Sequence, residues 1–230
     1  MLTTAEAREA ILAAMPVFAA TSVGVDNSVG RILRQSVVAE RDQPPFDRVM
    51  MDGIALRYDD LDSGRTEFPI QAMQAAGDAP LTLAEGRCIE IMTGASLPLG
   101  ADCIVPVERI AVADGVATID ADYSVERHRF IHPRASDHAA GAELLTAGKQ
   151  VTPADVAVIA SAGLASVEVS ARPVIRVIST GNELVAPGQA IEPHQIRLSN
   201  GPAIQAMLGQ HNYVDSTHDH IVDQRETLLE

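Results

Sequence analysis

The sequence PVIRVISTGNE, residues 173–183, decides the fold class. Its first part, residues 173–178, is almost continuously β-branched, which is typical of a parallel strand that is buried on both faces. A turn that contains Gly181 and a carboxylate follows this strand. Since parallel strands are joined by crossover helices, the stretch predicts that a helix comes next.

The residues that follow provide the helix and a second strand. Asn200 is suited to cap the helix, Pro202 lies in its first turn, and Gly209 is expected to end it. Residues 213–217 then have the composition of a strand. The order strand, helix, strand predicts the opening of a βαβ unit and therefore an α/β domain.

The last residues predict one more helix. Residues 224–230 have the pattern of its first turns, with Asp223 and Glu226 placed as a capping box. A parallel sheet needs more strands than residues 171–230 supply, so we expect this chain to be the front part of a longer protein.

Two helical segments are predicted at the amino terminus. Thr3 and Glu6 have the spacing of a capping box, and residues 4–15 form an Ala-rich amphipathic pattern that Pro16 ends. A second helix-and-turn segment is predicted around residues 28–35.

A further helix is predicted immediately before the α/β region. Thr152 provides an N-cap, Pro153 the first helical position and Asp155 an acid at the third position, and Gly163 ends the helix.

Residues 37–130 have the pattern of an all-β unit. Short apolar runs at 88–92, 103–107 and 116–119 are separated by Gly, Pro and Asp at short intervals. The patterns together predict a helical lead-in at the amino terminus, then a β-rich unit, then a further helix and the start of an α/β domain.

The composition excludes several classes of partner. The chain of 230 residues has 31 acidic and 17 basic residues, a formal net charge of −14, and such a field repels nucleic acid and anionic membranes. The longest nearly uncharged stretch, residues 156–167, is too short to span a bilayer. Cys88 and Cys103 form no CxxC motif, so we expect buried inert thiols in a reducing, cytoplasmic compartment.

General enzyme motifs are absent, but several turns combine glycine with a carboxylate or a hydroxyl. In their order and spacing these turns resemble the molybdopterin molybdenumtransferases, the enzymes of the last step of molybdenum cofactor synthesis. The stretches that carry the resemblance are PPFDRVMMDGIA (44–55), AGDAP (76–80), IEIMTGASLPLGADCIVPVE (89–108), ASDHAAGAELLTAGKQVTPADVAVIASAG (135–163), ISTGNELVAPGQAI (178–191) and HQIRLSN (194–200).

The resemblance implies a fold and a reaction. The fold is a mixed α/β multidomain protein. A helical lasso from residues 1–40 and 135–170 holds an inserted β-rich domain at 41–134. It precedes a three-layer α/β molybdopterin-binding domain, of which residues 171–230 are the start. The reaction converts adenylylated molybdopterin and molybdate into the molybdenum cofactor and AMP, assisted by Mg²⁺. The family also implies a homodimer, a molybdopterin-adenylyltransferase as the upstream partner, and a molybdoenzyme or chaperone downstream.

The family motifs assign the candidate site residues. The residues matched as catalytic are Asp52, Thr93, Asp137 and Glu183; those matched as substrate-binding are Thr180, Gly181 and Asp223; and those matched as Mg²⁺ ligands are Asp52 and Glu183. Because both substrates are anions, carboxylates would repel them unless a hard cation stands between. Glu183 also follows the carboxyl end of a predicted parallel strand, where open α/β sheets bind ligands.

Each site residue also has a structural interpretation. Asp52 before Gly53 is an ordinary turn dipeptide, and Thr93 can close a hairpin. Asp137 can cap a helix or be a solvated charge, and Asp223 can be the N-cap of the last segment.

Three departures from the family pattern leave alternatives open. Arg48-Val49 stands where the family has Asn-Ser, and Asn182 and Leu198 each replace an acid. The chain can therefore also be a divergent, non-catalytic molybdopterin-binding or assembly protein, or, less in keeping with its motifs, a nucleotide-processing enzyme. His218, Asp219 and His220 suggest a metal site, but a polar strand end explains them better.

Overall fold

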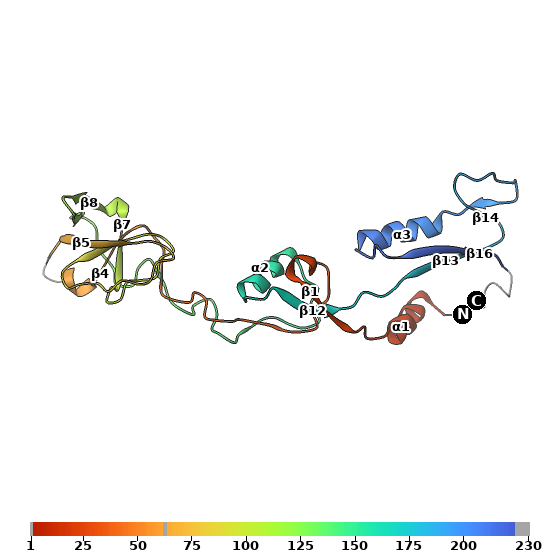
Figure 1. Cartoon of the computed structure of the whole chain (residues 1–230), viewed down its shortest axis with the longest axis horizontal. Helices are drawn as coiled ribbons and strands as arrows, with labels where there is room; N and C mark the ends of the chain where they lie inside the picture. The colour runs from red at the N-terminus through yellow and green to blue at the C-terminus, as the bar shows by residue number, and fades with distance from the viewer. Residues whose placement is uncertain (1, 62–63, 224–230) are drawn as a thin grey trace. The chain divides into compact units, whose positions relative to one another are not determined.

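The computed structural model describes residues 2–61 and 64–223, and the chain divides into two compact units (Figure 1). Unit 1 consists of Met1–Val37 and Leu145–Glu230, and unit 2 consists of Val38–Leu144. Unit 2 is thus inserted into unit 1 along the sequence. The fold is mixed α/β, and the division into a lasso, a β-rich domain and a three-layer domain stays a prediction. The short strands β2 (Val37–Val38) and β11 (Glu143–Leu145) contain the two boundaries.

The first helix of unit 1 is α1 (Thr4–Ala14), and it is capped as predicted. The Thr3 hydroxyl accepts a hydrogen bond from the Glu6 N–H at 3.3 Å, and Glu6 accepts one from the Thr3 N–H at 2.7 Å. The helix ends one residue before its cap, Met15. None of its residues is buried.

Three further elements complete the first part of unit 1. Strand β1 (Ala20–Gly24) pairs antiparallel with β12 (Ser166–Ser170), and Figure 1 shows the two side by side. Helix α2 (Pro153–Ser161) has the predicted capping box between Thr152 and Asp155.

The helix-and-turn segment predicted around residues 28–35 is wrong. A short 3₁₀ helix, Val25–Asn27, precedes it, a turn follows at residues 29–30, and residues 32–33 are then paired with distant backbone instead of forming a helix. Leu33 is fully buried, its N–H donates to Lys149 O at 2.9 Å, and it bridges to Val169. Pairing with distant backbone therefore determines the conformation here, because it buries an apolar side chain that an isolated helix would expose.

The second part of unit 1 contains the predicted βαβ unit. Strands β13 (Arg176–Thr180) and β16 (Thr217–Ile221) are parallel neighbours, and α3 (Asn200–Gln210) connects them and lies along them (Figure 1). Between β13 and α3, β14 (Leu184–Val185) pairs in parallel with β15 (Ile196–Arg197).

The details of this unit differ from the prediction. The cap of α3 is Ser199 rather than Asn200, the helix continues through Gly209, and β16 begins where the predicted strand ended. The expected burial on both faces of the first strand is also wrong: Val177 is 8% exposed, but Val174 is 94% and Ile178 52% exposed. Within the described residues α3 covers one face of this two-stranded sheet, so the β-branched run has cover on one side.

Unit 2 consists mainly of β-strands. Its main sheet has six strands in the order β7-β4-β6-β5-β9-β8, antiparallel except for the parallel pair β5–β6. The strands of unit 2 are β3 (Arg48–Val49), β4 (Gly53–Leu56), β5 (Glu67–Gln74), β6 (Cys88–Ile91), β7 (Cys103–Pro106), β8 (Ile110–Ala113), β9 (Val116–Ile119) and β10 (Ile131–His132).

The sheet of unit 2 is buried on both faces. Successive residues of β4, such as Ile54 and Ala55, belong to two different hydrophobic clusters, as expected for side chains that alternate across a strand. Cys88 and Cys103 lie in one of these clusters, and burial raises their pKa to about 11 and about 12. Such thiols are not ionised at neutral pH, in keeping with the predicted inert role.

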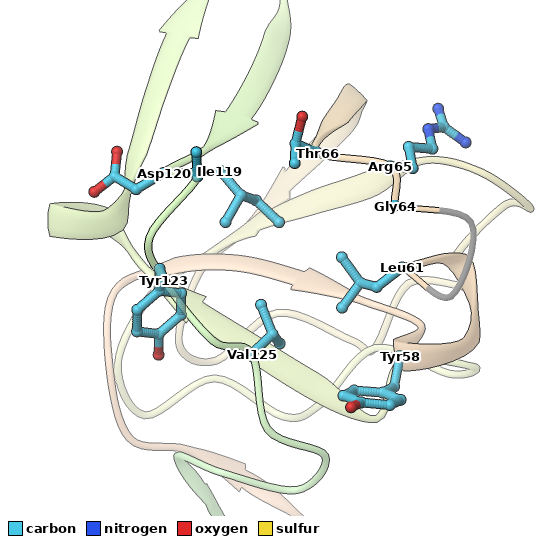
Figure 2. Close-up of a pocket in the computed structure, with 10 residues that line it drawn as sticks. Tyr58, Leu61, Gly64, Arg65, Thr66, Ile119, Asp120, Tyr123 and Val125 are labelled. Atoms are coloured by element: carbon cyan, nitrogen blue, oxygen red, sulfur yellow. The ribbon is translucent and has the colours of Figure 1, made fainter.

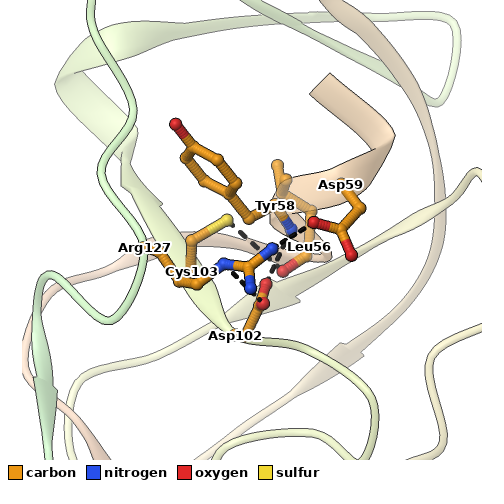
Figure 3. Close-up of polar contacts among 6 residues, drawn as sticks. All are labelled: Leu56, Tyr58, Asp59, Asp102, Cys103 and Arg127. Atoms are coloured by element: carbon orange, nitrogen blue, oxygen red, sulfur yellow. Dashed lines mark hydrogen bonds and ion pairs between the residues drawn. The ribbon is translucent and has the colours of Figure 1, made fainter. Parts of the chain in front are cut away.

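An ionic cluster in unit 2 joins residues that are far apart in the sequence (Figure 3). Arg127 pairs with Asp59 and, at 3.3 Å, with Asp102, and its guanidinium lies 5.1 Å from the centre of the Tyr58 ring. Asp102 also accepts a hydrogen bond from the Tyr58 N–H at 2.6 Å. Because every charge here has a partner, the cluster is structural.

Candidate functional site

Asp52 and Thr93 are brought into direct contact. The Thr93 N–H and hydroxyl both donate to Asp52 Oδ1, at 2.7 and 2.6 Å. These two bonds hold the pKa of the Asp52 carboxyl below its ordinary value, the hydroxyl making the larger contribution. The described residues offer no hydrogen bond to Oδ2, so the carboxylate is fixed by one oxygen and presents the other.

The backbone around Asp52 is anchored on both sides. Gly53 begins β4 with φ +154°, and an added Cβ would lie 2.0 Å from Val105 O. The Asp52 carbonyl accepts a hydrogen bond from the Val107 N–H at 2.9 Å. Close approach of β7 therefore requires glycine directly after the carboxylate, which explains the Asp-Gly pair better than an ordinary turn does.

Asp137 is held by a histidine that the sequence analysis missed. His132 Nε2 lies 3.0 Å from Asp137 Oδ1, and His132 Nδ1 lies 3.1 Å from Arg48 Nη2. Arg48 and His132 face each other across the β3–β10 pair. The available signal was weak: His132 lies five residues before Asp137 in the same segment, outside every quoted motif.

Two further aspartates that the sequence analysis did not select fix the Asp137 segment. Asp47 accepts a hydrogen bond from the Arg134 N–H at 2.8 Å. Asp42 accepts one from the Arg134 side chain at 2.6 Å and one from the Ala140 N–H at 2.9 Å, and these bonds lower its pKa. The signal was the position of Asp47 in the PPFD sequence, which carries the family resemblance. The loop that contains Asp137 is therefore held by hydrogen bonds before it, at Arg134, and after it, at Ala140.

The remaining candidates lie in unit 1, at the carboxyl end of β13. Thr180 and Glu183 line a cavity of about 440 Å³ whose wall includes Leu198 and the first residues of α3. This is the edge of the parallel strand pair at which the sequence predicted ligand binding. Leu198 is 8% exposed and contributes an apolar wall.

Gly181 controls where the Glu183 carboxylate lies. The φ of Gly181 is +140°, and an added Cβ would approach the Glu183 carboxylate to 2.6 Å. A larger residue at 181 would displace that carboxylate, because the carboxylate is the movable end of a flexible side chain. Gly181 is thus a supporting residue of the site.

Asp223 is joined to the same edge through its backbone. Its N–H donates to Asn182 Oδ1 at 3.0 Å, so the Asn182 side chain connects the loops after β13 and β16. The helix at 224–230 that Asp223 was expected to cap lies outside the described residues.

Three polar side chains of β16 contact β13 or the residue that follows it. His218 Nε2 lies 2.9 Å from Ser179 Oγ, Asp219 pairs with Arg176 at 2.6 Å, and His220 Nε2 lies 2.7 Å from Gly181 O. Each side chain therefore has a structural role in the βαβ unit.

The structure thus groups the predicted residues into two sets. Asp52, Thr93 and Asp137 lie in unit 2, whereas Thr180, Gly181, Glu183 and Asp223 lie in unit 1. Between residues 2 and 223, leaving out 62–63, no three His, Cys, Asp or Glu side chains gather in a group that could hold a metal.

A separate cavity lies in unit 2, and none of these residues lines it (Figure 2). It has a volume of about 220 Å³, and residues such as Tyr58, Tyr123 and Val125 line it. The predicted site is therefore distinct from this cavity. No helix of the described part of the chain is long and apolar enough to cross a bilayer.

Comparison with known proteins finds relatives in the family that the sequence motifs resemble. Residues 2–163 match the family model described as the MoeA N-terminal region, domains I and II. A Synechocystis protein named molybdopterin molybdenumtransferase is 38% identical over all 230 residues, which are 59% of its own length. A Mycobacterium tuberculosis protein named molybdopterin molybdenumtransferase 2 is 37% identical over 80% of this chain and 46% of its own.

A solved structure gives the same result. The crystal structure of a molybdopterin biosynthesis MoeA protein from Pyrococcus horikoshii superposes with a TM-score of 0.81 at 26% identity, covering 99% of this chain and 59% of that one. The chain thus spans about three fifths of the length of this structure and of its Synechocystis relative. On the match of residues 2–163, the chain belongs to the family of the MoeA N-terminal region.

Proposed function

We propose that this chain is the front part of a molybdopterin molybdenumtransferase, which inserts molybdenum from molybdate into adenylylated molybdopterin and releases AMP. The two relatives described above are named molybdopterin molybdenumtransferases, and they match 100% and 80% of this chain. The observation that carries the proposal is the contact between Asp52 and Thr93, which come from two separate family motifs and meet at 2.6 Å.

The Asp52 carboxylate has the chemistry that such a reaction requires. Mg²⁺ takes hard oxygen ligands and is held in proteins by one or two carboxylates together with substrate phosphates. Asp52 presents one oxygen while Thr93 fixes the other, and Glu183 is a second carboxylate at a cavity edge. Each of these carboxylates has the chemistry that Mg²⁺ prefers, and a bound Mg²⁺ would neutralise the charge that builds up on a pyrophosphate during cleavage.

The chain's own residues would bind and orient the substrates. Thr180 and the start of α3 line a cavity whose helix N-terminus favours anionic groups. Asp137 lies on a loop held by Asp42 and Asp47. In the proposed reaction the aspartates organise the cation and the scissile bond, and the cavity of unit 1 receives a phosphate-bearing part of the substrate.

The deciding experiment compares full-length wild-type protein with Asp52→Asn. With Mg²⁺, molybdate and adenylylated molybdopterin, we expect AMP release to fall by about 100-fold in the variant, because the charge opposite the transferring group is lost. The melting temperature should stay within a few degrees, since the carbonyl oxygen of asparagine can still accept both hydrogen bonds from Thr93.

The matched control is Asp114→Asn, an exposed turn aspartate of unit 2 at which asparagine tolerates the φ of 51°. Its AMP release should equal that of the wild type. If wild-type protein binds adenylylated molybdopterin but releases no AMP, the chain is a non-catalytic binding or assembly protein of the same fold. Unchanged release by Asp52→Asn would remove Asp52 from the site.

We also propose a cellular compartment, an oligomeric state and partner proteins for this chain. The free thiols of Cys88 and Cys103 suit a reducing compartment, so we place the protein in the cytoplasm. It would act as a homodimer, receive its substrate from a molybdopterin-adenylyltransferase, and pass its product to a molybdoenzyme or chaperone.

A further inference from the structure

Arg48, His132 and Asp137 form a chain of side-chain contacts in unit 2. Arg48 Nη2 lies 3.1 Å from His132 Nδ1, and His132 Nε2 lies 3.0 Å from Asp137 Oδ1. Arg48 and His132 are partners in the register of the antiparallel pair β3–β10. Directly opposite residues of such a pair project from the same face, so the backbone itself brings the two side chains together.

The chemistry of the three groups fixes the direction of the hydrogen bonds. A guanidinium has five N–H donors and no acceptor, so His132 Nδ1 must accept from Arg48. A neutral imidazole whose Nδ1 accepts carries its proton on Nε2, and that proton is donated to Asp137. The order of donation is therefore Arg48 to His132 to Asp137.

The Asp137 side chain depends on this contact for its orientation. Its backbone is fixed, because the Asp137 N–H donates to Gln43 O at 2.9 Å. Its side chain is 47% exposed, and His132 is its one hydrogen-bond partner within the described residues. Without His132 the carboxylate would be free to rotate in solvent.

We propose that Arg48 and His132 are positioning residues, which hold the Asp137 carboxylate in one orientation for the reaction. The inference rests on the proposed function, because that function gives Asp137 its role. The proposal also assigns a role to Arg48, which departs from the family pattern described in the sequence analysis. In this chain Arg48 orients a histidine, which in turn orients a carboxylate, and it acts without touching substrate.

The hydrogen-bond chain can be tested without any activity, by two-dimensional ¹H–¹⁵N NMR of the histidine rings in the whole protein at about pH 8, where an ordinary imidazole is neutral. We expect His132 to carry its ring proton on Nε2. In Asp137→Leu that proton should shift upfield, because its acceptor is gone. A proton on Nδ1, or no change in Asp137→Leu, would overturn the proposed geometry.

The positioning role is tested by two replacements of His132 in the full-length protein. In His132→Gln the amide nitrogen occupies the place of Nε2 and can still donate to Asp137. In His132→Asn the shorter side chain reaches only the place of Nδ1 and cannot. We expect kcat for AMP release to fall about tenfold or more in His132→Asn, the equivalent of one charge-assisted hydrogen bond, with KM little changed.

His132→Gln should recover most of that loss, and Arg48→Met should resemble His132→Asn in direction. His138→Asn is the matched control, because the His138 side chain has no hydrogen bond within the described residues, and it should behave as the wild type. Equal activity of the Gln and Asn variants of His132 would overturn the positioning role. A wild-type protein without AMP release would instead reject the proposed function and with it this role, while the NMR result would still decide the geometry.

Discussion

Gly53 shows how one residue without a side chain sets the position of a carboxylate. An added Cβ there would lie 2.0 Å from the backbone oxygen of Val105, which cannot move without displacing β7. We expect Gly53→Ala to lower the free energy of unfolding by about 2–3 kcal/mol through steric overlap and backbone strain. Urea denaturation followed by circular dichroism measures the loss.

Gly115→Ala separates the two causes of that loss. Gly115 has φ +75° but no atom within 4 Å of an added Cβ, so this variant carries the cost of the backbone conformation without the overlap. Its destabilisation should be clearly the smaller of the two. Equal losses at 53 and 115 would show that the approach of β7 is looser than the structure indicates.

At this scale the sequence predicted which residues belong to a site but not which of them touch. Asp52 and Thr93 were selected from separate motifs, and their contact joins positions 41 residues apart. His132 was missed because its role depends on β3 and β10 becoming neighbours, and no local pattern records that pairing.

Helix α2 offers a prediction at the scale of one element. Hydrogen bonds from Lys149 and from Thr152 lower the pKa of Asp155 to about 2. Since the pKa is lower in the folded chain than in the unfolded one, the Asp155 carboxylate stabilises the fold above about pH 4, and this contribution is lost as the pH falls towards 2. Asp155→Asn removes the charge and the ion pair with Lys149, so its free energy of unfolding should fall less steeply between about pH 4 and pH 2 than that of the wild type.

Urea denaturation at a series of pH values tests this difference in slope. Asp114→Asn, in an exposed turn, serves as the control and should keep the wild-type slope. If Asp155→Asn loses stability with acid as steeply as the wild type, the contact with Lys149 does not act in solution.

Elements were predicted well where their signals are local. The capping boxes of α1 and α2 each lie within four residues, and both were placed correctly. The predictions for residues 28–35 and for the limits of β16 were wrong because partners far away in sequence decide them. Leu33 is extended because it pairs with residues near 149 and 169, and β16 takes its register from β13.

The exposed apolar side chains of α1 lead to a prediction for the whole molecule. Ile11 is 63% exposed and Leu12 60% exposed, although a helix this short is marginal in water without packing. We expect the amino terminus and residues 150–170 to help form the interface of the proposed homodimer. Ile11→Lys with Leu12→Lys should raise the dimer dissociation constant at least about tenfold, because two apolar contacts are lost.

Light scattering at micromolar concentration measures the change in mass. The control is Val112→Lys, which alters an apolar residue of β8 that is 58% exposed and should leave the dimer intact. A wild-type protein that is monomeric at this concentration would reject the homodimer, and an unchanged dimer in the double variant would place its interface elsewhere.

The insertion of unit 2 into unit 1 determines the order in which the strands can pair during synthesis. A ribosome delivers β1 early, but β1 has no partner until β12 emerges, after the whole of Val38–Leu144 has been made. Every strand of the six-stranded sheet is available before that moment. The inserted unit can therefore complete its core on the nascent chain, whereas β1 must wait with an unpaired edge, and that edge is a site for a chaperone or for a misfolded contact.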